Sequence, residues 1–358
     1  MELQSIPHMF FDRAASRGLR PAQLVKQDGT WQAVTWQAMR DQVHHMAQGL
    51  LTLGLQAGDR VALLASSRAE WVQCDLSIMA TASITVPVYP ASLPEQVAYI
   101  LNNAEVTLVC VDTLAQLDKV LQVRAAVPTL RHIVLLDGQP PQDDPMVLSL
   151  SDLITRGAAA TQYATLLDER WRSLTPDHEA TYVYTSGTTG PPKGVVQTHG
   201  NHLFMVQSCE QVMGVQEGDV HLLFLPLAHS FARLEAFLGL YAGLTTAFAE
   251  SIEALVENMR EVRPMLVFSV PRVYEKIYAR VQAAGSSGSP IKQALFQWCV
   301  RVGRQVSTLQ QQQQSLSLGL RLRQRLAHQL VFKKLHQTVG GRLRYFVSGG
   351  APLAQEIA

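Results

Sequence analysis

Three features are missing from the 358-residue sequence, and each absence excludes a class of protein. The first residues, MELQSIPHMFFDRAASRG, contain no basic head followed by a long apolar run, so we expect no secretory signal. No segment offers the roughly 20 uninterrupted apolar residues that a membrane span requires. The formal net charge is +1, which argues against nucleic acid as the main partner because phosphate neutralisation needs an excess of Lys and Arg.

Cysteine is also scarce. The sequence has 4 cysteines, which are far apart and form no CxxC pair: Cys74, Cys110, Cys209 and Cys299. Cys74 and Cys110 lie in apolar surroundings, which favours buried free thiols over metal ligands or nucleophiles. We therefore expect a soluble, globular protein of the cytoplasm.

Apolar segments, in contrast, are abundant, and their pattern indicates an α/β fold. Hydrophobic residues make up 47% of the chain, enough for a large core divided among two or more lobes. Short apolar runs alternate with helical patterns, which predicts layered subdomains whose mostly parallel sheets are flanked by helices. Strands are predicted at 60–65, 84–89, 106–111, 132–136, 180–185, 221–227, 265–270 and 343–353.

Two helix starts are predicted from capping boxes. Ser67 with Glu70, and Ser92 with Glu95, have the spacing at which each side chain bonds the backbone amide of the other residue. A further helix is expected over residues 114–126.

The stretch YVYTSGTTGPPKG, residues 182–194, follows an apolar strand and combines glycines, hydroxyls and one positive charge, that of Lys193. Glycines let backbone amides approach an anion without a side chain in the way. Those of this stretch are Gly187, Gly190 and Gly194, and its hydroxyl donors include Ser186, Thr188 and Thr189. A surface linker is the alternative, but the preceding strand and the lysine favour a loop that binds polyphosphate.

This loop differs from the Walker A loop of NTPases, G-x-x-x-x-G-K-[ST], at two positions. Pro192 takes the place of the glycine before the lysine, and proline has no amide to donate to a phosphate. Gly194 takes the place of the Ser or Thr whose hydroxyl would bind magnesium. The sequence therefore predicts a phosphate loop of another kind.

The stretch YTSGTTGPPKGV resembles the phosphate-loop signature of the adenylate-forming enzymes, which include acyl-CoA synthetases, luciferase-like enzymes and peptide-synthetase adenylation domains. Three later segments resemble further motifs of that family, in the same order: LPLAHSFAR (225–233), SVPRVYEKIY (269–278) and GGRLRYFVSGGAPL (340–353). The resemblance covers essentially the whole chain and is nearest to bacterial long-chain fatty-acid–CoA ligases.

The resemblance implies a two-step reaction. A fatty-acid carboxylate attacks the α-phosphate of ATP, giving acyl-adenylate and pyrophosphate, and the thiol of coenzyme A then displaces AMP. Mg²⁺ is expected to bridge the phosphates. No protein nucleophile is required, so catalysis consists mostly of positioning and charge stabilisation.

The resemblance also implies functional residues. Lys193 and His229 are the expected catalytic residues, although a histidine at position 229 could equally cap the following helix. Thr185 is also a candidate Mg²⁺ ligand. The residues expected to bind ATP are Thr185, Ser186, Gly187, Thr188, Thr189, Gly190, Lys193, Gly349, Gly350 and Ala351. Nearby, Arg233 and Glu235 could form a local surface pair.

Complete family members carry further motifs after SGGAPL, including a magnesium-binding Glu, a ribose-binding Asp and a C-terminal domain with a catalytic Lys. The sequence ends at Ala358 without them. We therefore expect residues 1–358 to be a truncated N-terminal domain that is inactive alone. Its expected subdomains are 50–210, with the phosphate loop, and 1–49 plus 211–358.

Two alternatives to long-chain activation stay open: a non-catalytic protein that binds a nucleotide or an acyl group, and a ligase for a medium-chain or aryl acid. Acyl-chain length, oligomeric state and pathway are not indicated by the sequence, because an acyl tunnel is built from scattered apolar residues.

The segment LGLRLRQRLAHQLVFKKLHQ, residues 318–337, is basic and amphipathic. A surface helix with a solvated charged face is the interpretation that we favour. The alternative is peripheral contact with an anionic membrane surface, which would suit an enzyme that takes fatty acids from lipid.

Overall fold

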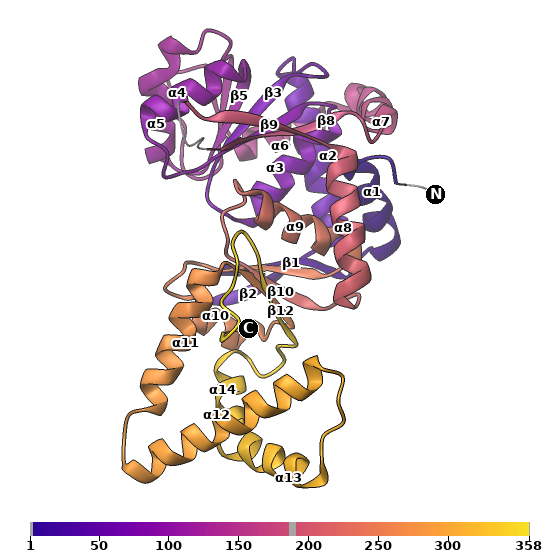
Figure 1. Cartoon of the computed structure of the whole chain (residues 1–358). Helices are drawn as coiled ribbons and strands as arrows, with labels where there is room; N and C mark the ends of the chain where they lie inside the picture. The colour runs from indigo at the N-terminus through magenta and orange to yellow at the C-terminus, as the bar shows by residue number, and fades with distance from the viewer. Residues whose placement is uncertain (1–2, 186–190, 358) are drawn as a thin grey trace. The chain divides into compact units, whose positions relative to one another are not determined.

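The computed structural model describes residues 3–185 and 191–357 (Figure 1). The chain divides into two compact units, Met1–Ala249 and Glu250–Ala358, which are described separately. Both combine strands and helices, and most strand pairs are parallel, so the predicted α/β class with mostly parallel sheets is confirmed.

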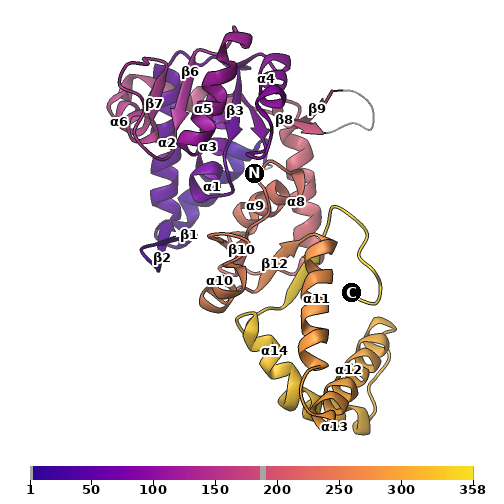
Figure 2. The ribbon, with the colours of Figure 1, turned by 90° about the vertical axis from the view of Figure 1, so that its left-hand side faces the viewer.

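A seven-stranded sheet forms one layer of the first unit, in the order β7-β6-β5-β3-β4-β8-β9. Figure 2 shows β7 and β9 toward opposite edges. Neighbouring strands are parallel, apart from the antiparallel pair β8–β9. The strands are β3 (Arg60–Leu64), β4 (Ile84–Val88), β5 (Val106–Val111), β6 (His132–Leu135), β7 (Val147–Ser149), β8 (Glu179–Thr185) and β9 (Lys193–Thr198).

Helices cover both faces of this sheet, as its continuous apolar strands require. On one face, α4 and α5 contribute Val97 and Leu117 to a core with alternate strand residues such as Val109. On the other face, the Cys74 thiol of α3 hydrogen-bonds Cys110 of β5. The helices that follow the strands are α3 (Ala69–Ala80), α4 (Pro94–Asn103), α5 (Leu114–Val123), α6 (Leu150–Ala159) and α7 (Ala164–Ser173).

The cysteine prediction is confirmed at these two positions. Cys74 and Cys110 are buried free thiols. The pKa of the Cys74 thiol is raised well above its ordinary value, first by the hydrogen bond with Cys110 and then by burial. Cys74 is therefore held as a neutral thiol, the form that is neither a nucleophile nor a metal ligand.

A second group of strands in the first unit has the order β10-β11-β1-β2. The pairs β10–β11 and β11–β1 are parallel, and β1–β2 is an antiparallel hairpin. The elements are β1 (Pro21–Gln27), β2 (Thr30–Thr35), β10 (Val220–Leu223), β11 (Thr245–Phe248), α1 (Ile6–Arg17), α2 (Trp36–Thr52), α8 (His199–Met213) and α9 (Ser230–Ala242).

The second unit pairs β12 in parallel with β13 and carries a helical arm, in which α12 packs against α13. Cys299, Val302 and Val306 of α12 form a small core with Leu320 and Ala327 of α13. The elements are α10 (Leu255–Val262), β12 (Leu266–Ser269), α11 (Pro271–Gly285), α12 (Pro290–Gln311), α13 (Leu318–Ala327), a π-helical turn (His328–Phe332), α14 (Lys333–Thr338) and β13 (Tyr345–Ser348). Among the described residues, no helix combines the length and apolar character needed to cross a bilayer.

Both predicted capping boxes are wrong. Helix α3 starts at Ala69, and its N-cap residue is Arg68, which makes no side-chain cap bond. Ser67 does not cap the helix because its hydroxyl bonds the backbone of Leu225 and Leu227. Helix α4 starts at Pro94, one residue later than predicted, since proline suits the first helical position. Its cap is the Leu93 amide, which donates to Gln96 Oε1 at 2.9 Å.

The predicted strands of the larger sheet all lie within residues 50–210. Residues 114–126 are helical as predicted, with a final 3₁₀ turn over Arg124–Ala126. The division into subdomains 50–210 and 1–49 plus 211–358 stays a prediction.

Candidate functional site

The β8–β9 hairpin carries the described part of the predicted phosphate loop. Its last pair places Thr185 directly opposite Lys193, and both residues are exposed. Directly opposed residues point to the same face of a sheet, so the Thr185 and Lys193 side chains leave the last described pair of the hairpin on one face. The predicted ligand-binding residues Ser186, Gly187, Thr188, Thr189 and Gly190 lie outside the described residues.

Glycine is needed at position 194 for a structural reason that the sequence did not indicate. It pairs with Tyr184, and a Cβ atom at position 194 would lie 3.1 Å from Cζ of the tyrosine ring. The ring is fixed from the other side, because the Tyr184 hydroxyl donates to Asn103 Oδ1 of α4 at 2.6 Å. Glycine at position 194 therefore lets the ring lie over the base of the hairpin.

The LPLAHSFAR segment is held on its N-terminal side by Ser67. The Ser67 hydroxyl donates to the Leu225 carbonyl at 2.7 Å and accepts from the Leu227 amide at 2.8 Å. The chain then turns into α9, with His229 as the N-cap. The position of His229 is thus set by a residue that lies about 160 positions earlier in the sequence.

His229 caps α9, as the structural alternative predicted. Its Nδ1 accepts the Phe231 amide at 3.1 Å, and its side chain is exposed. Because Nδ1 is an acceptor, the neutral ring carries its proton on Nε2 and presents a donor to solvent. The catalytic role of His229 stays a prediction.

Arg233 occupies a buried site one helical turn after His229. Its Nη2 donates to both carboxylate oxygens of Asp75, at 2.8 and 2.7 Å, and Nη1 donates to the Thr181 hydroxyl at 2.5 Å. The guanidinium also lies over the rings of Trp71 and Phe237, 5.6 and 5.2 Å from their centroids. One side chain therefore connects α9 to α3 and to β8, the strand that ends at Thr185.

The predicted surface pair between Arg233 and Glu235 is wrong. Both side chains are buried, and they lie two positions apart on a helix, so they point in different directions. Glu235 Oε1 instead lies 3.0 Å from His221 Nδ1, and His221 Nε2 lies 2.8 Å from the Thr246 hydroxyl.

Burial sets the charge states of His221 and Glu235. It lowers the pKa of His221 to about 3 and raises that of Glu235 well above its ordinary value. The two side chains are therefore held as a neutral hydrogen-bonded pair, which attaches α9 to β10. Gly239 is required here, because a Cβ atom would lie 2.7 Å from His221 Nε2.

In the second unit, Gly349, Gly350 and Ala351 form the turn after β13. The Gly349 amide donates to the Ser269 carbonyl at 3.1 Å, and Gly350 has a φ of +80°, which favours glycine. The Tyr274 hydroxyl contacts the carbonyls of Val267 and Val347, at 3.1 and 2.9 Å, and so fixes β12 to β13. Ligand binding by this turn stays a prediction.

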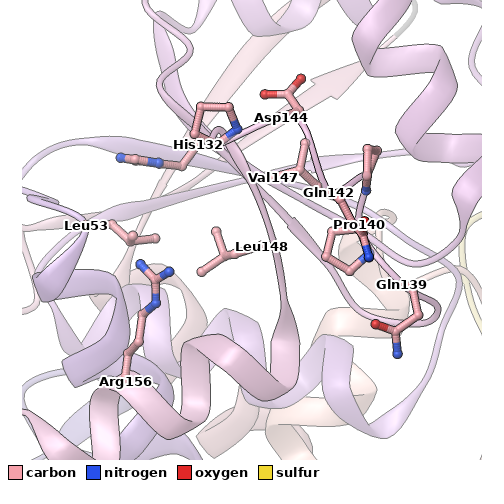
Figure 3. A pocket seen from close by; sticks show the side chains of 11 residues that line it. Leu53, His132, Gln139, Pro140, Gln142, Asp144, Val147, Leu148 and Arg156 are labelled. Carbon is pink, nitrogen blue, oxygen red and sulfur yellow. The ribbon is translucent and has the colours of Figure 1, made fainter.

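A cavity of about 510 Å³ lies at the β6–β7 side of the larger sheet, away from the β8–β9 edge (Figure 3). It is lined by Leu53, His132, Gln139, Pro140, Pro141, Gln142, Asp144, Pro145, Val147, Leu148 and Arg156. Asp144 pairs with Arg124, and burial lowers the pKa of His132. None of the residues predicted to bind ATP lines this cavity.

The described residues contain no group of three or more His, Cys, Asp or Glu side chains that could hold a metal ion. Thr185 supplies a single hydroxyl oxygen, the type of ligand that Mg²⁺ accepts alongside phosphate oxygens. The Mg²⁺ site therefore stays a prediction.

Comparison with known proteins identifies similar sequences over most of the chain. The model of one family, described as AMP-binding enzyme, matches residues 10–358. The long-chain-fatty-acid–CoA ligase FadD15 of Mycobacterium tuberculosis is 33% identical over 341 residues, 92% of this chain and 54% of the relative. The peroxisomal long chain acyl-CoA synthetase 7 of Arabidopsis thaliana is 31% identical over 346 residues, 93% of this chain and 47% of the relative. The chain thus spans about half the length of the curated relatives it matches.

Two solved structures share the fold. The adenylation domain of a carboxylate reductase from Mycobacterium chelonae has a TM-score of 0.72 at 20% identity, over 99% of this chain and 55% of that chain. The N-terminal domain of FACL13 from Mycobacterium tuberculosis has a TM-score of 0.63 at 19% identity, over 100% of this chain and 72% of that chain.

Proposed function

Because the chain belongs to the AMP-binding enzyme family, we propose that the full-length protein activates a long-chain fatty acid with ATP and transfers it to coenzyme A. The names of the relatives support this substrate class, since both sequence relatives described above act as long-chain acyl-CoA ligases or synthetases. The acid's carboxylate oxygen bonds to the α-phosphorus as pyrophosphate leaves. The thiol then loses its proton to solvent, and its sulfur bonds to the acyl carbon as AMP leaves.

The pairing of Thr185 with Lys193 is the observation that carries this proposal. An ammonium group and a hydroxyl on side chains that leave the same face of a β-ladder are suited to the charge that develops on a departing pyrophosphate. The ladder holds the backbone of both residues before any ligand arrives, so only the side chains have to adjust to the phosphates. Thr185 would also be the protein ligand of Mg²⁺, which supplies charge neutralisation when bound.

His229 is proposed to contribute a hydrogen bond at the acyl-adenylate. Its cap geometry leaves Nε2–H as a donor directed away from the helix. Ser67 and Arg233 act on either side of His229 as positioning residues: Ser67 fixes the preceding turn, and Arg233 anchors the first turn of α9.

The test compares Lys193→Ala with Lys276→Ala, which removes an exposed lysine from α11. We expect Lys193→Ala to lower fatty-acid-dependent pyrophosphate release by the full-length protein at least ~100-fold, the typical effect of losing one oxyanion-stabilising group. Lys276→Ala should have no effect. Equal rates in both variants would contradict the proposal, and a panel of long-chain, medium-chain and aryl acids would identify the substrate class.

A further inference from the structure

Charge is distributed very unevenly along this nearly neutral chain. Residues 276–355 contain 12 of the 30 Lys and Arg and none of the 29 Asp and Glu. The remainder of the chain therefore has an acidic excess, 18 basic residues against 29 acidic ones. A separation of this size concentrates positive potential on the helical arm of the second unit.

The arm also exposes leucines at helical spacing. The exposed fractions are 80% for Leu318, 66% for Leu322, 49% for Leu326 and 41% for Leu330. Residues four positions apart lie on one face of a helix, so these side chains form a continuous stripe along α13 and into the π-helical turn. We call it the leucine stripe.

Packing fixes the direction of the leucine stripe. The opposite side of α13 contributes Leu320 and Ala327 to the core shared with α12, where both are buried. Figure 1 shows α13 lying along α12 in the helical arm. The stripe therefore points away from the core of the arm, because the helix cannot rotate without exposing Leu320.

Basic side chains border the stripe on both sides. At about 3.6 residues per turn, Arg321 and Arg325 lie on one side of the leucines and Arg323 on the other. All three are exposed, as are Lys333 and Lys334 in α14. No acidic residue within 276–355 is available to neutralise them.

We propose that this face of the arm binds the surface of an anionic lipid bilayer, with the leucine stripe inserted among the acyl chains and the flanking arginines on the headgroup phosphates. A helix with a basic border and an apolar face lies in the plane of such an interface. Each Lys or Arg near an anionic surface adds attraction, and the aliphatic part of arginine can extend along the apolar surface.

Nucleic acid and acidic proteins would also attract the arginines, but they give no role to four exposed leucines on the same face. Duplex DNA offers charge without an apolar interior. The combination of charge and apolar surface is therefore what distinguishes a bilayer here. The proposal is independent of the proposed function, because binding to lipid requires neither ATP nor an acyl substrate.

The test is sedimentation of the chain with vesicles of phosphatidylcholine, with and without phosphatidylglycerol. We expect binding to the anionic vesicles and little to the neutral ones. The Arg321→Gln, Arg323→Gln, Arg325→Gln variant should bind roughly 100-fold more weakly, about 5-fold for each arginine. The Leu322→Gln, Leu326→Gln variant should lose at least ~10-fold, because less apolar surface is buried in the bilayer.

Matched controls replace exposed arginines and exposed apolar side chains elsewhere on the surface. Arg131→Gln, Arg156→Gln, Arg172→Gln removes three exposed arginines of the first unit, and Leu19→Gln, Val212→Gln removes two exposed apolar side chains. Both should bind like the unmodified chain. All substituted side chains are exposed, so circular dichroism and thermal unfolding should match in every variant.

Three results would overturn the proposal. The first is equal binding to neutral and anionic vesicles. The second is a loss on removing the arginines but none on removing the leucines, which indicates a general polyanion surface. The third is duplex DNA competing fully with anionic vesicles at equal phosphate concentration.

Discussion

Arg233 and Asp75 form a two-point ion pair in the interior of the first unit, with both side chains 1% exposed. Such a pair is costly to disrupt because removing one partner leaves the other charge buried and uncompensated. The pair joins α9, which carries His229 at its start, to α3.

Asp75→Asn should therefore destabilise the chain by about 3–5 kcal/mol, measured by urea unfolding. The exposed pair Arg172–Asp168 provides the control, and Asp168→Asn should cost less than ~1 kcal/mol. Similar free energies of unfolding for the two variants would show that the buried pair stabilises the chain no more than the exposed pair does.

The buried histidines predict a fall in stability on acidification. Burial lowers the pKa of His199 and His221 to about 3, and that of His202 well below its ordinary value. The unfolded chain takes up these protons below about pH 6.5 while the folded chain does not, so stability declines from there toward pH 3.

The slope of this decline can be measured for one histidine at a time. Between pH 6 and pH 4.5, His199→Gln should reduce the slope of unfolding free energy against pH by about 1.4 kcal/mol per unit. The slope is informative even if the variant is less stable overall. Glu235 makes stability fall as the pH rises, the opposite of the histidines. Its raised pKa makes the folded state retain a proton that the unfolded state loses above about pH 4.5. An unchanged slope would mean that His199 is protonated in the folded chain.

Gly194→Ala should cost about 1–3 kcal/mol, because the new methyl group meets the Tyr184 ring at the base of the hairpin. A double-mutant cycle with Tyr184→Ala tests this cause directly. If the ring is the obstacle, the added cost of Gly194→Ala disappears in the Tyr184→Ala background. A cost that persists there would identify backbone conformation as the reason for glycine.

Ser67→Ala should destabilise the turn before α9. It leaves the Leu225 carbonyl and the Leu227 amide without their partner, at a cost of about 1–3 kcal/mol. Hydrogen exchange at the Leu227 amide should accelerate correspondingly. Ser66→Ala, at an exposed neighbouring position, is the matched control and should leave that amide unchanged.

The sequence predicted several strands because a buried strand is a local pattern. It did not predict β1, β2, β7, β9 or β11, and the predicted run at 343–353 contains only the 4-residue strand β13. The apolar run at 106–111 coincides with β5, and the runs at 60–65 and 84–89 each exceed their strands by one residue. The Ser67 cap failed for a non-local reason: the Ser67 hydroxyl bonds a segment that begins at Leu225, and no local rule predicts that partner. The Ser92 cap failed for a local reason, because Pro94 takes the first helical position.

The buried polar groups of α9 do not follow from the local sequence, in which Arg233 and Glu235 resemble a surface pair. A signal was available in the sequence. The helix SFARLEAFLGLYA is apolar around most of its circumference, and such helices are buried, so charges within one require internal partners. Which partners they have depends on how α3, β10 and α9 pack, and this is set by tertiary structure.

The position of β9 as the outermost strand of its sheet has a consequence for the behaviour of the chain in solution. Val195 and Val196 are 46% and 49% exposed, and an edge strand with apolar side chains is a template for pairing with another chain. Concentrated solutions of the chain should therefore associate through this strand, edge to edge, while each copy stays folded. A charged residue at position 195 should suppress that association.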